Sequence, residues 1–189
     1  EGSADTAEMI RALDAIGFAH AGTGRDIERA REPTYFAAHG GTVALIATSS
    51  TFPGMSPAGE KRPGLNPLHV EPITLVTKGE MKSLRSIALR GGWQGYDLPG
   101  PDATELRINE KAFRVSAKPG LTFDVSTVDR SALLESVDVA RAKAPVVLFS
   151  IHAHETQSGA YGDERPADFL PPLFRDAIDR GASLIVRHG

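Results

Sequence analysis

An apolar strand that ends in histidines constrains the fold of this 189-residue chain more than any other feature. Residues 145–154 read Pro-Val-Val-Leu-Phe-Ser-Ile-His-Ala-His and become polar only at their end. Such a run is typical of a strand inside a covered sheet. Residues 167–180 have the apolar spacing of a helix, and residues 183–187 form another apolar strand before His188. This order predicts an α/β fold with parallel strands joined by a right-handed crossover.

Apolar periodicity in the rest of the chain favours the same α/β class. The further predicted helices cover about residues 5–16, 26–31 and 81–88 and a segment after Ser126, and the further predicted strands cover residues 34–38, 42–48 and 121–125. Ser126 and Asp129 have the spacing of a capping box. Residues 52–72 are rich in proline and glycine, which predicts a long loop. Residues 93–118 have no clear periodicity and are left unassigned.

Composition excludes several classes of protein. The chain is 41% hydrophobic and 24% charged, which predicts one globular domain over residues 1–189. The formal net charge is −3 and there is no basic block, so nucleic acid is not an expected partner. No apolar run approaches the roughly 20 residues of a membrane span. Because the chain has no cysteine, any metal must be held by His, Asp, Glu, Asn or backbone oxygen.

The first five residues are polar rather than signal-like, and the chain does not begin with methionine. We therefore expect the natural N-terminus to lie elsewhere. The compartment is left open, with export to the cell envelope as one option.

Three histidines fall at the predicted strand ends, where ligands of open parallel sheets bind. Residues two apart on a strand point to the same side, so His152 and His154 are expected to present two imidazoles to one site, with His188 nearby. Neutral imidazole binds zinc, iron and similar ions. Glu155 could ligate a metal, orient a histidine or transfer protons. The alternative is that these are ordinary polar residues where strands leave the core, because a His-x-His pattern alone is a weak signal.

Other polar segments have simpler interpretations. The loop at residues 156–165 is long enough to cover a substrate, although Asp163 and its neighbours fit an acidic turn before a helix. Residues 22–25 follow no clear strand and are interpreted as a turn rather than a phosphate loop.

Isolated histidines and aromatic residues are expected to have structural roles. His20, His39 and His69 lie beside predicted turns and are expected at the surface. Trp93 and Tyr96 are expected to pack a loop, with a stacking platform as the alternative.

Several segments resemble the poly-gamma-glutamate capsule biosynthesis (CapA-type) family. They are residues 12–24, 30–33, 43–47, 62–68, 146–155 and 178–189, and the resemblance extends to most of the chain outside about residues 71–123. It implies a calcineurin-like metallophosphatase fold, an α/β/β/α sandwich of two facing sheets flanked by helices. It also implies a centre of two divalent metal ions, Mn, Fe or Zn, that activate a water molecule.

The family motifs assign roles to single residues. His152 corresponds to the metal histidine of one element, and His188 to a histidine of a second. Glu155 matches a nearby family glutamate with a spacing one residue shorter, and His154 stands where the family often has glycine. The N-terminal third of the family, with its Asp/Glu elements and Asn-Asn-His segment, and its last histidine have no counterpart here. We therefore expect an excerpt of a longer protein that is inactive alone.

The resemblance favours a metal-dependent hydrolase of capsule or poly-gamma-glutamate metabolism. It would act on a phosphoester or a gamma-glutamyl amide, with His152, His154 and His188 as metal ligands and Glu155 as the catalytic residue. The expected partners are an anionic polymer or a phosphorylated small substrate, and a capsule synthesis complex.

The alternative hypothesis is a non-catalytic component of a polymer synthesis or export machine. Such a protein would bind polyglutamate or a membrane partner without turnover. Its candidate contacts are Arg25, Arg62 and Arg165.

Overall fold

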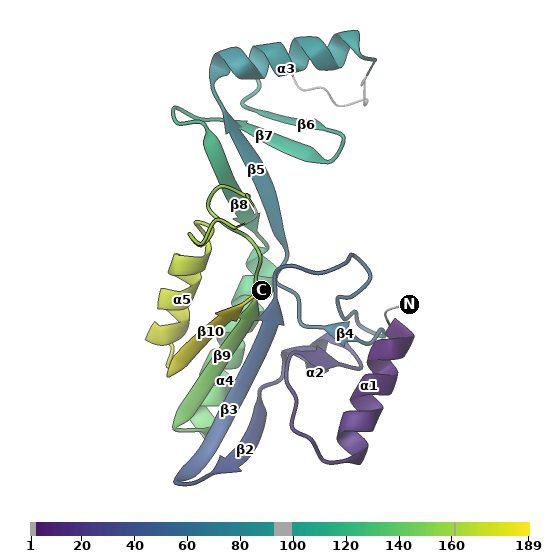
Figure 1. The fold of residues 1–189 in the computed structure, drawn as a ribbon, viewed down its shortest axis with the longest axis vertical. Coiled ribbons are helices and arrows are strands. Elements are labelled where there is room, and N and C mark those ends of the chain that lie inside the picture. The colour runs from purple at the N-terminus through teal and green to yellow at the C-terminus, as the bar shows by residue number, and fades with distance from the viewer. Residues whose placement is uncertain (1–2, 93–99, 161) are drawn as a thin grey trace. The chain divides into compact units, whose positions relative to one another are not determined.

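The computed structural model describes residues 3–92, 100–160 and 162–189 and confirms the α/β class (Figure 1). The chain divides into two compact units. The first comprises Glu1–His69, Val125–Glu155 and Leu170–Gly189, and the second comprises Val70–Asp124 and Thr156–Phe169. The single domain over residues 1–189 and the sandwich of two facing sheets stay predictions.

The first unit is built on a four-stranded sheet with the order β10-β9-β3-β2. The strands are β2 (Thr34–Ala38), β3 (Gly41–Ser49), β9 (Val146–His152) and β10 (Leu184–His188). β3, β9 and β10 are parallel, and β2 is the antiparallel neighbour of β3. The predicted parallel pairing of the two apolar strands is therefore confirmed, and three strands have their carboxyl ends at one edge.

Helices α4 (Thr127–Lys143) and α5 (Leu170–Asp179) belong to this unit, and α4 packs against β3 and β9 (Figure 1). The apolar positions predicted for α4 are all buried: Leu133, Leu134, Val137 and Ala140. They lie in a core that also contains Phe149 and Ile151 of β9, both 0% exposed. Burying a large apolar side chain contributes about 1.5–3 kcal/mol, so the alternation of β9 and the helical spacing of α4 jointly stabilise this layer.

The remaining elements of the first unit are short or N-terminal. Helices α1 (Ser3–Ala15) and α2 (Ile27–Arg31) confirm two predicted helices, and β1 (Thr23–Gly24) pairs with β4 (Gly64–Leu65). The backbone N–H of Asn66 donates to Gly22 O at 2.8 Å. The Asn66 amide also donates to Ala47 O of β3 at 3.0 Å. Asn66 is 2% exposed, so its hydrogen bonds fix the β4 segment against the sheet.

The strand predicted to reach His154 ends at His152. The Ala153 N–H still donates to His188 O at 2.8 Å, but the His154 N–H donates to Thr51 Oγ1 at 2.9 Å instead of to a strand carbonyl. The threonine hydroxyl therefore replaces the next ladder bond, and His154 lies beyond the strand.

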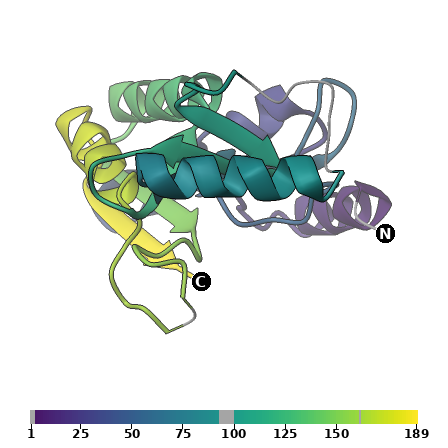
Figure 2. The same cartoon turned by 90° about the horizontal axis from the view of Figure 1, so that it is seen from above.

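The second unit contains a sheet with the order β6-β7-β5-β8 and one helix. Its elements are β5 (Val70–Val76), α3 (Lys78–Arg90), β6 (Glu105–Ile108), β7 (Lys111–Val115) and β8 (Gly120–Val125). Figure 2 shows α3 over the strands of this sheet. Met81 of α3 packs with Val76 and Leu106 in a small core. The predicted helix and the predicted strand at residues 121–125 are confirmed.

Other expectations for residues 52–118 need correction. The predicted loop at residues 52–72 contains β4 and the start of β5, including Pro72, and the unassigned stretch contains β6 and β7. Charged residues interrupt the apolar alternation of β6 and β7, so the sequence does not predict these strands. Arg114 of β7 donates to Glu105 of β6 at 2.7 Å. Trp93 and Tyr96 lie outside the described residues. Within the described ranges, no helix is long and apolar enough to cross a membrane.

Candidate functional site

Three neighbouring strands of the first unit end side by side. Ser49 of β3 is in register with His152 of β9, which is in register with His188 of β10. The Nδ1 atoms of the two histidines are hydrogen-bonded at 3.3 Å and their ring centroids are 5.2 Å apart. The structure thus brings together the two imidazoles that the sequence placed on separate strands.

His154 is the third imidazole at this edge. Its ring centroid is 4.7 Å from that of His152, although the two residues do not share a strand. Gly189 leaves room for it, because a Cβ atom at this glycine would lie 2.7 Å from His154 Cδ2. Gly189 also has a φ of +127°, which glycine adopts readily.

The geometry of the His152–His188 pair fits two ligands of one ion. Zinc–nitrogen bonds of about 2.0–2.1 Å at a tetrahedral angle separate two nitrogen atoms by roughly 3.3–3.4 Å. Burial lowers the pKa of His152, as do the neighbouring His154 and His188, and this favours the neutral imidazole that binds metals. Among residues 3–92, 100–160 and 162–189, however, no group of three or more His, Cys, Asp or Glu side chains is arranged to hold a metal ion. Within the described residues, the fit to a metal ion therefore rests on His152 and His188, whose spacing suits two ligands of one ion.

Glu155 is anchored beside the histidines. Its Oε2 accepts a hydrogen bond from Ser50 Oγ at 2.6 Å, and its Oε1 accepts one from Thr51 Oγ1 at 2.9 Å. The Arg187 guanidinium donates to the backbone O of Glu155 and of Ala153, both at 3.2 Å. Both carboxylate oxygens are thus held by the loop that follows β3.

Sequence reasoning missed the hydroxyl residues that hold Glu155. Residues 49–51 read Ser-Ser-Thr immediately after the apolar part of β3. The same rule that singled out the histidines, polar residues at the carboxyl end of a buried strand, applies to this triplet.

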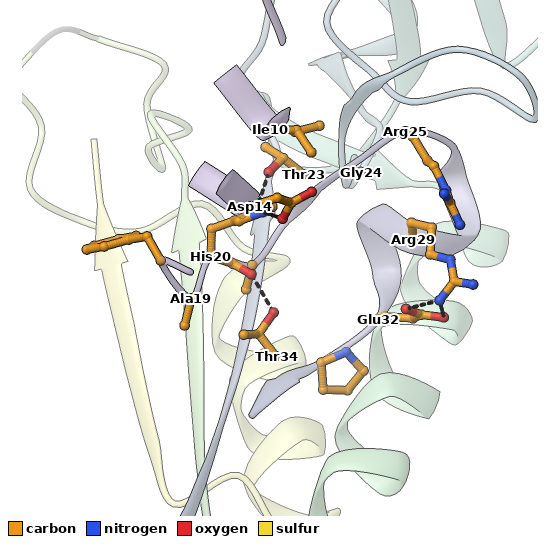
Figure 3. Close-up of a pocket in the computed structure, with 13 residues that line it drawn as sticks. Ile10, Asp14, Ala19, His20, Thr23, Gly24, Arg25, Arg29, Glu32 and Thr34 are labelled. Carbon is orange, nitrogen blue, oxygen red and sulfur yellow. Dashed lines mark hydrogen bonds and ion pairs between the residues drawn. The ribbon is translucent and has the colours of Figure 1, made fainter. Parts of the chain in front are cut away.

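The first unit also contains a pocket of about 460 Å³ (Figure 3). Its lining residues do not include His152, His154 or His188. Residues of α1, of the segment before β1, of α2 and of β2 line it. His20 lines this pocket and is partly buried, with a side chain that is 20% exposed. His39 is exposed, and His69 is 55% exposed but bound to Asp129.

The three arginines proposed as polymer contacts have different environments. Arg62 donates two hydrogen bonds to Pro57 O, at 3.2 and 2.8 Å. Arg165 is paired with Asp163 at 2.9 Å, within the second unit. Arg25 lines the 460 Å³ pocket, and its side chain is 71% exposed.

Comparisons with known proteins agree with the resemblance found in the sequence. The family model described as bacterial capsule synthesis protein PGA_cap matches residues 1–189. The chain is also similar to the uncharacterized proteins y4sH and y4uA of Sinorhizobium fredii (strain NBRC 101917 / NGR234), each 33% identical over 191 residues. These matches cover 96% of the chain and 40% of each relative, so the chain spans about two fifths of the length of these curated relatives. The chain belongs to the family of bacterial capsule synthesis proteins.

Proposed function

We propose that this protein is a metal-dependent hydrolase of capsule metabolism, and that His152 and His188 are two of its metal ligands. The single observation that supports the proposal is the 3.3 Å separation of their Nδ1 atoms at the carboxyl edge of parallel strands. The proposed substrate is an anionic polymer with gamma-glutamyl amide bonds or a phosphorylated small molecule, and membership of the capsule synthesis family supports this choice.

Each residue at the edge has a proposed role. The histidine pair would hold the ion, which would supply Lewis-acid chemistry when bound. Glu155, held by Ser50 and Thr51, accepts the proton that leaves the attacking water. His154 lies next to His152 and either adds a third ligand or orients the pair.

Two imidazoles do not complete a coordination shell, because zinc takes four ligands and manganese or iron commonly more. The proposal therefore requires further ligands, for which His154 and residues of the longer protein are the candidates. A second metal ion would also need ligands other than His152 and His188.

The direct test is a hydrolysis screen on the full-length protein loaded with Mn²⁺, Fe²⁺ or Zn²⁺. We expect turnover of 4-nitrophenyl phosphate or of a gamma-glutamyl anilide that is lost with EDTA and restored by the metal. His152→Ala and His188→Ala should each lower kcat/KM by about 100-fold or more. His39→Ala, an exposed histidine in a turn, is the matched control and should retain turnover.

Two outcomes would contradict the proposal. Metal-dependent turnover that survives both histidine substitutions would remove His152 and His188 as metal ligands. The other is tight binding of polyglutamate with no turnover of either substrate class, which would support the polymer-binding component instead.

A further inference from the structure

The 460 Å³ pocket of the first unit contains a hydroxyl, an imidazole and a carboxylate in series (Figure 3). The Oγ1 of Thr23 is 3.1 Å from Nδ1 of His20. The other ring nitrogen, Nε2, is 3.3 Å from Oδ1 of Asp14. All three residues line the pocket, so the series is open to a ligand.

The partners of the His20 ring determine its tautomer. A carboxylate only accepts hydrogen bonds, so Nε2 is the nitrogen that donates to Asp14. Nδ1 then has a free lone pair and accepts from the Thr23 hydroxyl. The Thr34 hydroxyl donates to the His20 backbone O and holds the residue in place. A hydroxyl that donates to an imidazole, which in turn donates to a carboxylate, is the arrangement of an activated nucleophile.

Guanidinium groups form another part of the same pocket (Figure 3). Arg29 donates to both carboxylate oxygens of Glu32, at 2.9 and 2.8 Å, so its charge is matched. The Nε of Arg25 is 3.8 Å from Asp26, whose carboxylate also caps α2 by accepting from the Arg29 N–H. The Arg25 guanidinium is therefore the group in this wall that is best placed to bind an anion.

We propose that Thr23 is the nucleophile of an acyl-transfer site that is separate from the histidine edge. His20 is its general base and Asp14 the positioning residue. The substrate class is a carboxylic ester whose acyl part has a negative charge for Arg25. The pocket volume of about 460 Å³ is within the usual range of small-molecule sites.

The proposed step balances in atoms and protons. The Thr23 oxygen bonds to the acyl carbon while its proton moves to Nδ1 of His20. The bond from the acyl carbon to the leaving alcohol breaks, and the alcohol takes that proton. Water then attacks the acyl-threonine by the same proton route, which releases the acid and restores the hydroxyl.

The same hydrogen bonds would also link α1 to β1 without any chemistry, so the test must separate a nucleophile from a structural tie. The full-length protein is incubated with a fluorophosphonate, which modifies activated hydroxyl groups, and the modified peptide is located by mass spectrometry. We expect modification at Thr23. EDTA should leave the labelling rate unchanged, which separates this site from the metal-dependent one.

Substitutions test the proposed roles of Thr23, His20 and Asp14. Thr23→Val should abolish labelling and Thr23→Ser should retain it, while the melting temperature of each reports on folding. His20→Gln should lower the labelling rate by about 100-fold and Asp14→Asn by about tenfold. His39→Gln is the matched histidine control and should label like the natural protein.

The preference for a negatively charged ester is tested by comparing two substrates. The 4-nitrophenyl monoester of glutaric acid has a negative charge, and 4-nitrophenyl butyrate does not. We expect hydrolysis of the charged ester to be faster by about tenfold, and Arg25→Gln to remove the preference. An unmodified Thr23 in the natural protein, or equal labelling of His20→Gln and the natural protein, would overturn the proposal and leave only the structural tie.

Discussion

Asp129 is the residue at which three segments of the first unit meet. Its carboxylate accepts from Arg31 Nη2 at 2.7 Å and from His69 Nδ1 at 2.6 Å. The His69 backbone N–H also donates to it, at 3.1 Å. The Asp129 side chain is 7% exposed and that of Arg31 is 24% exposed, so this ion pair is largely out of water. A carboxylate in this position is stable only while its partners are present.

Removing that charge should be costly. We expect Asp129→Asn to lower the free energy of unfolding by about 3 kcal/mol, because Arg31 keeps a partly buried charge without its partner. Urea denaturation measures the change. Asp138→Asn is the matched control: its partner is Arg180, both side chains are about half exposed, and the expected loss is below about 1 kcal/mol. Equal losses in the two variants would contradict this view of Asp129.

Acid should destabilise the first unit through the same residue. Burial raises the pKa of Asp129, but hydrogen bonds from the His69 side chain and backbone outweigh it and hold the pKa below its usual value. An unfolded aspartate has a pKa of about 3.9, so the stabilisation is present above about pH 4 and is lost as the pH falls through the lower folded value.

The melting temperature should therefore fall more steeply between about pH 5 and pH 3 in the natural protein than in Asp129→Asn. Identical slopes in the natural protein and Asp129→Asn would rule out Asp129 as the group responsible.

Thr51 connects two parts of the candidate metal site. Its hydroxyl donates to Glu155 and accepts from the backbone N–H of His154. We expect Thr51→Val to weaken Mn²⁺ binding by the full-length protein about tenfold, because outer-shell groups orient the ligands. Isothermal titration calorimetry measures the Kd. Thr42→Val, at the opposite end of β3, should bind as the natural protein does, and an unchanged Kd in Thr51→Val would contradict the proposed role.

At the scale of the element, helix α3 has a complete capping box. The Thr77 side chain accepts from the Glu80 N–H, and the Glu80 side chain accepts from the Thr77 N–H. The hydrogen bonds from the Thr77 backbone and side chain lower the pKa of Glu80. The box starts the helix that supplies Met81 to the small core of the second unit.

Removal of the cap should loosen this element first. Thr77→Ala is expected to cost about 1 kcal/mol, with amide exchange rising in α3 before the rest of the second unit. Hydrogen exchange with mass spectrometry measures this difference. Ser83→Ala lies in the middle of the same helix and is the control; faster exchange there than in Thr77→Ala would refute the cap as the determinant.

Elements with a strong apolar period could be predicted from the sequence. β3, β9 and α4 follow from the positions of buried residues, such as Phe149 and Val137, and β10 follows from an apolar run although Leu184 and Val186 are exposed. β6 and β7 could not be predicted, because charged residues such as Glu105 and Arg114 interrupt their apolar positions, although Leu106 of β6 packs in the small core of the second unit. The end of β9 was also misjudged, since a side-chain oxygen of Thr51 takes the N–H that would have continued the strand.

At the scale of the whole molecule, the sequence identified the edge of the candidate site but not its supports. Parallel strands that end in histidine predict that His152 and His188 meet, and they do. Asp14, His20 and Thr23 come together only through the path of the chain between α1 and β1, which no local pattern encodes. The family membership extends over residues 1–189, whereas the relatives are longer.

The metal content of the full-length protein tests the central claim most directly. Elemental analysis of the purified protein should find Mn, Fe or Zn in stoichiometric amounts. The double variant His152→Ala plus His188→Ala should lose it while remaining folded, and His39→Ala should keep it. Equal metal content in the double variant and the natural protein would contradict a shared ion between the two strand ends.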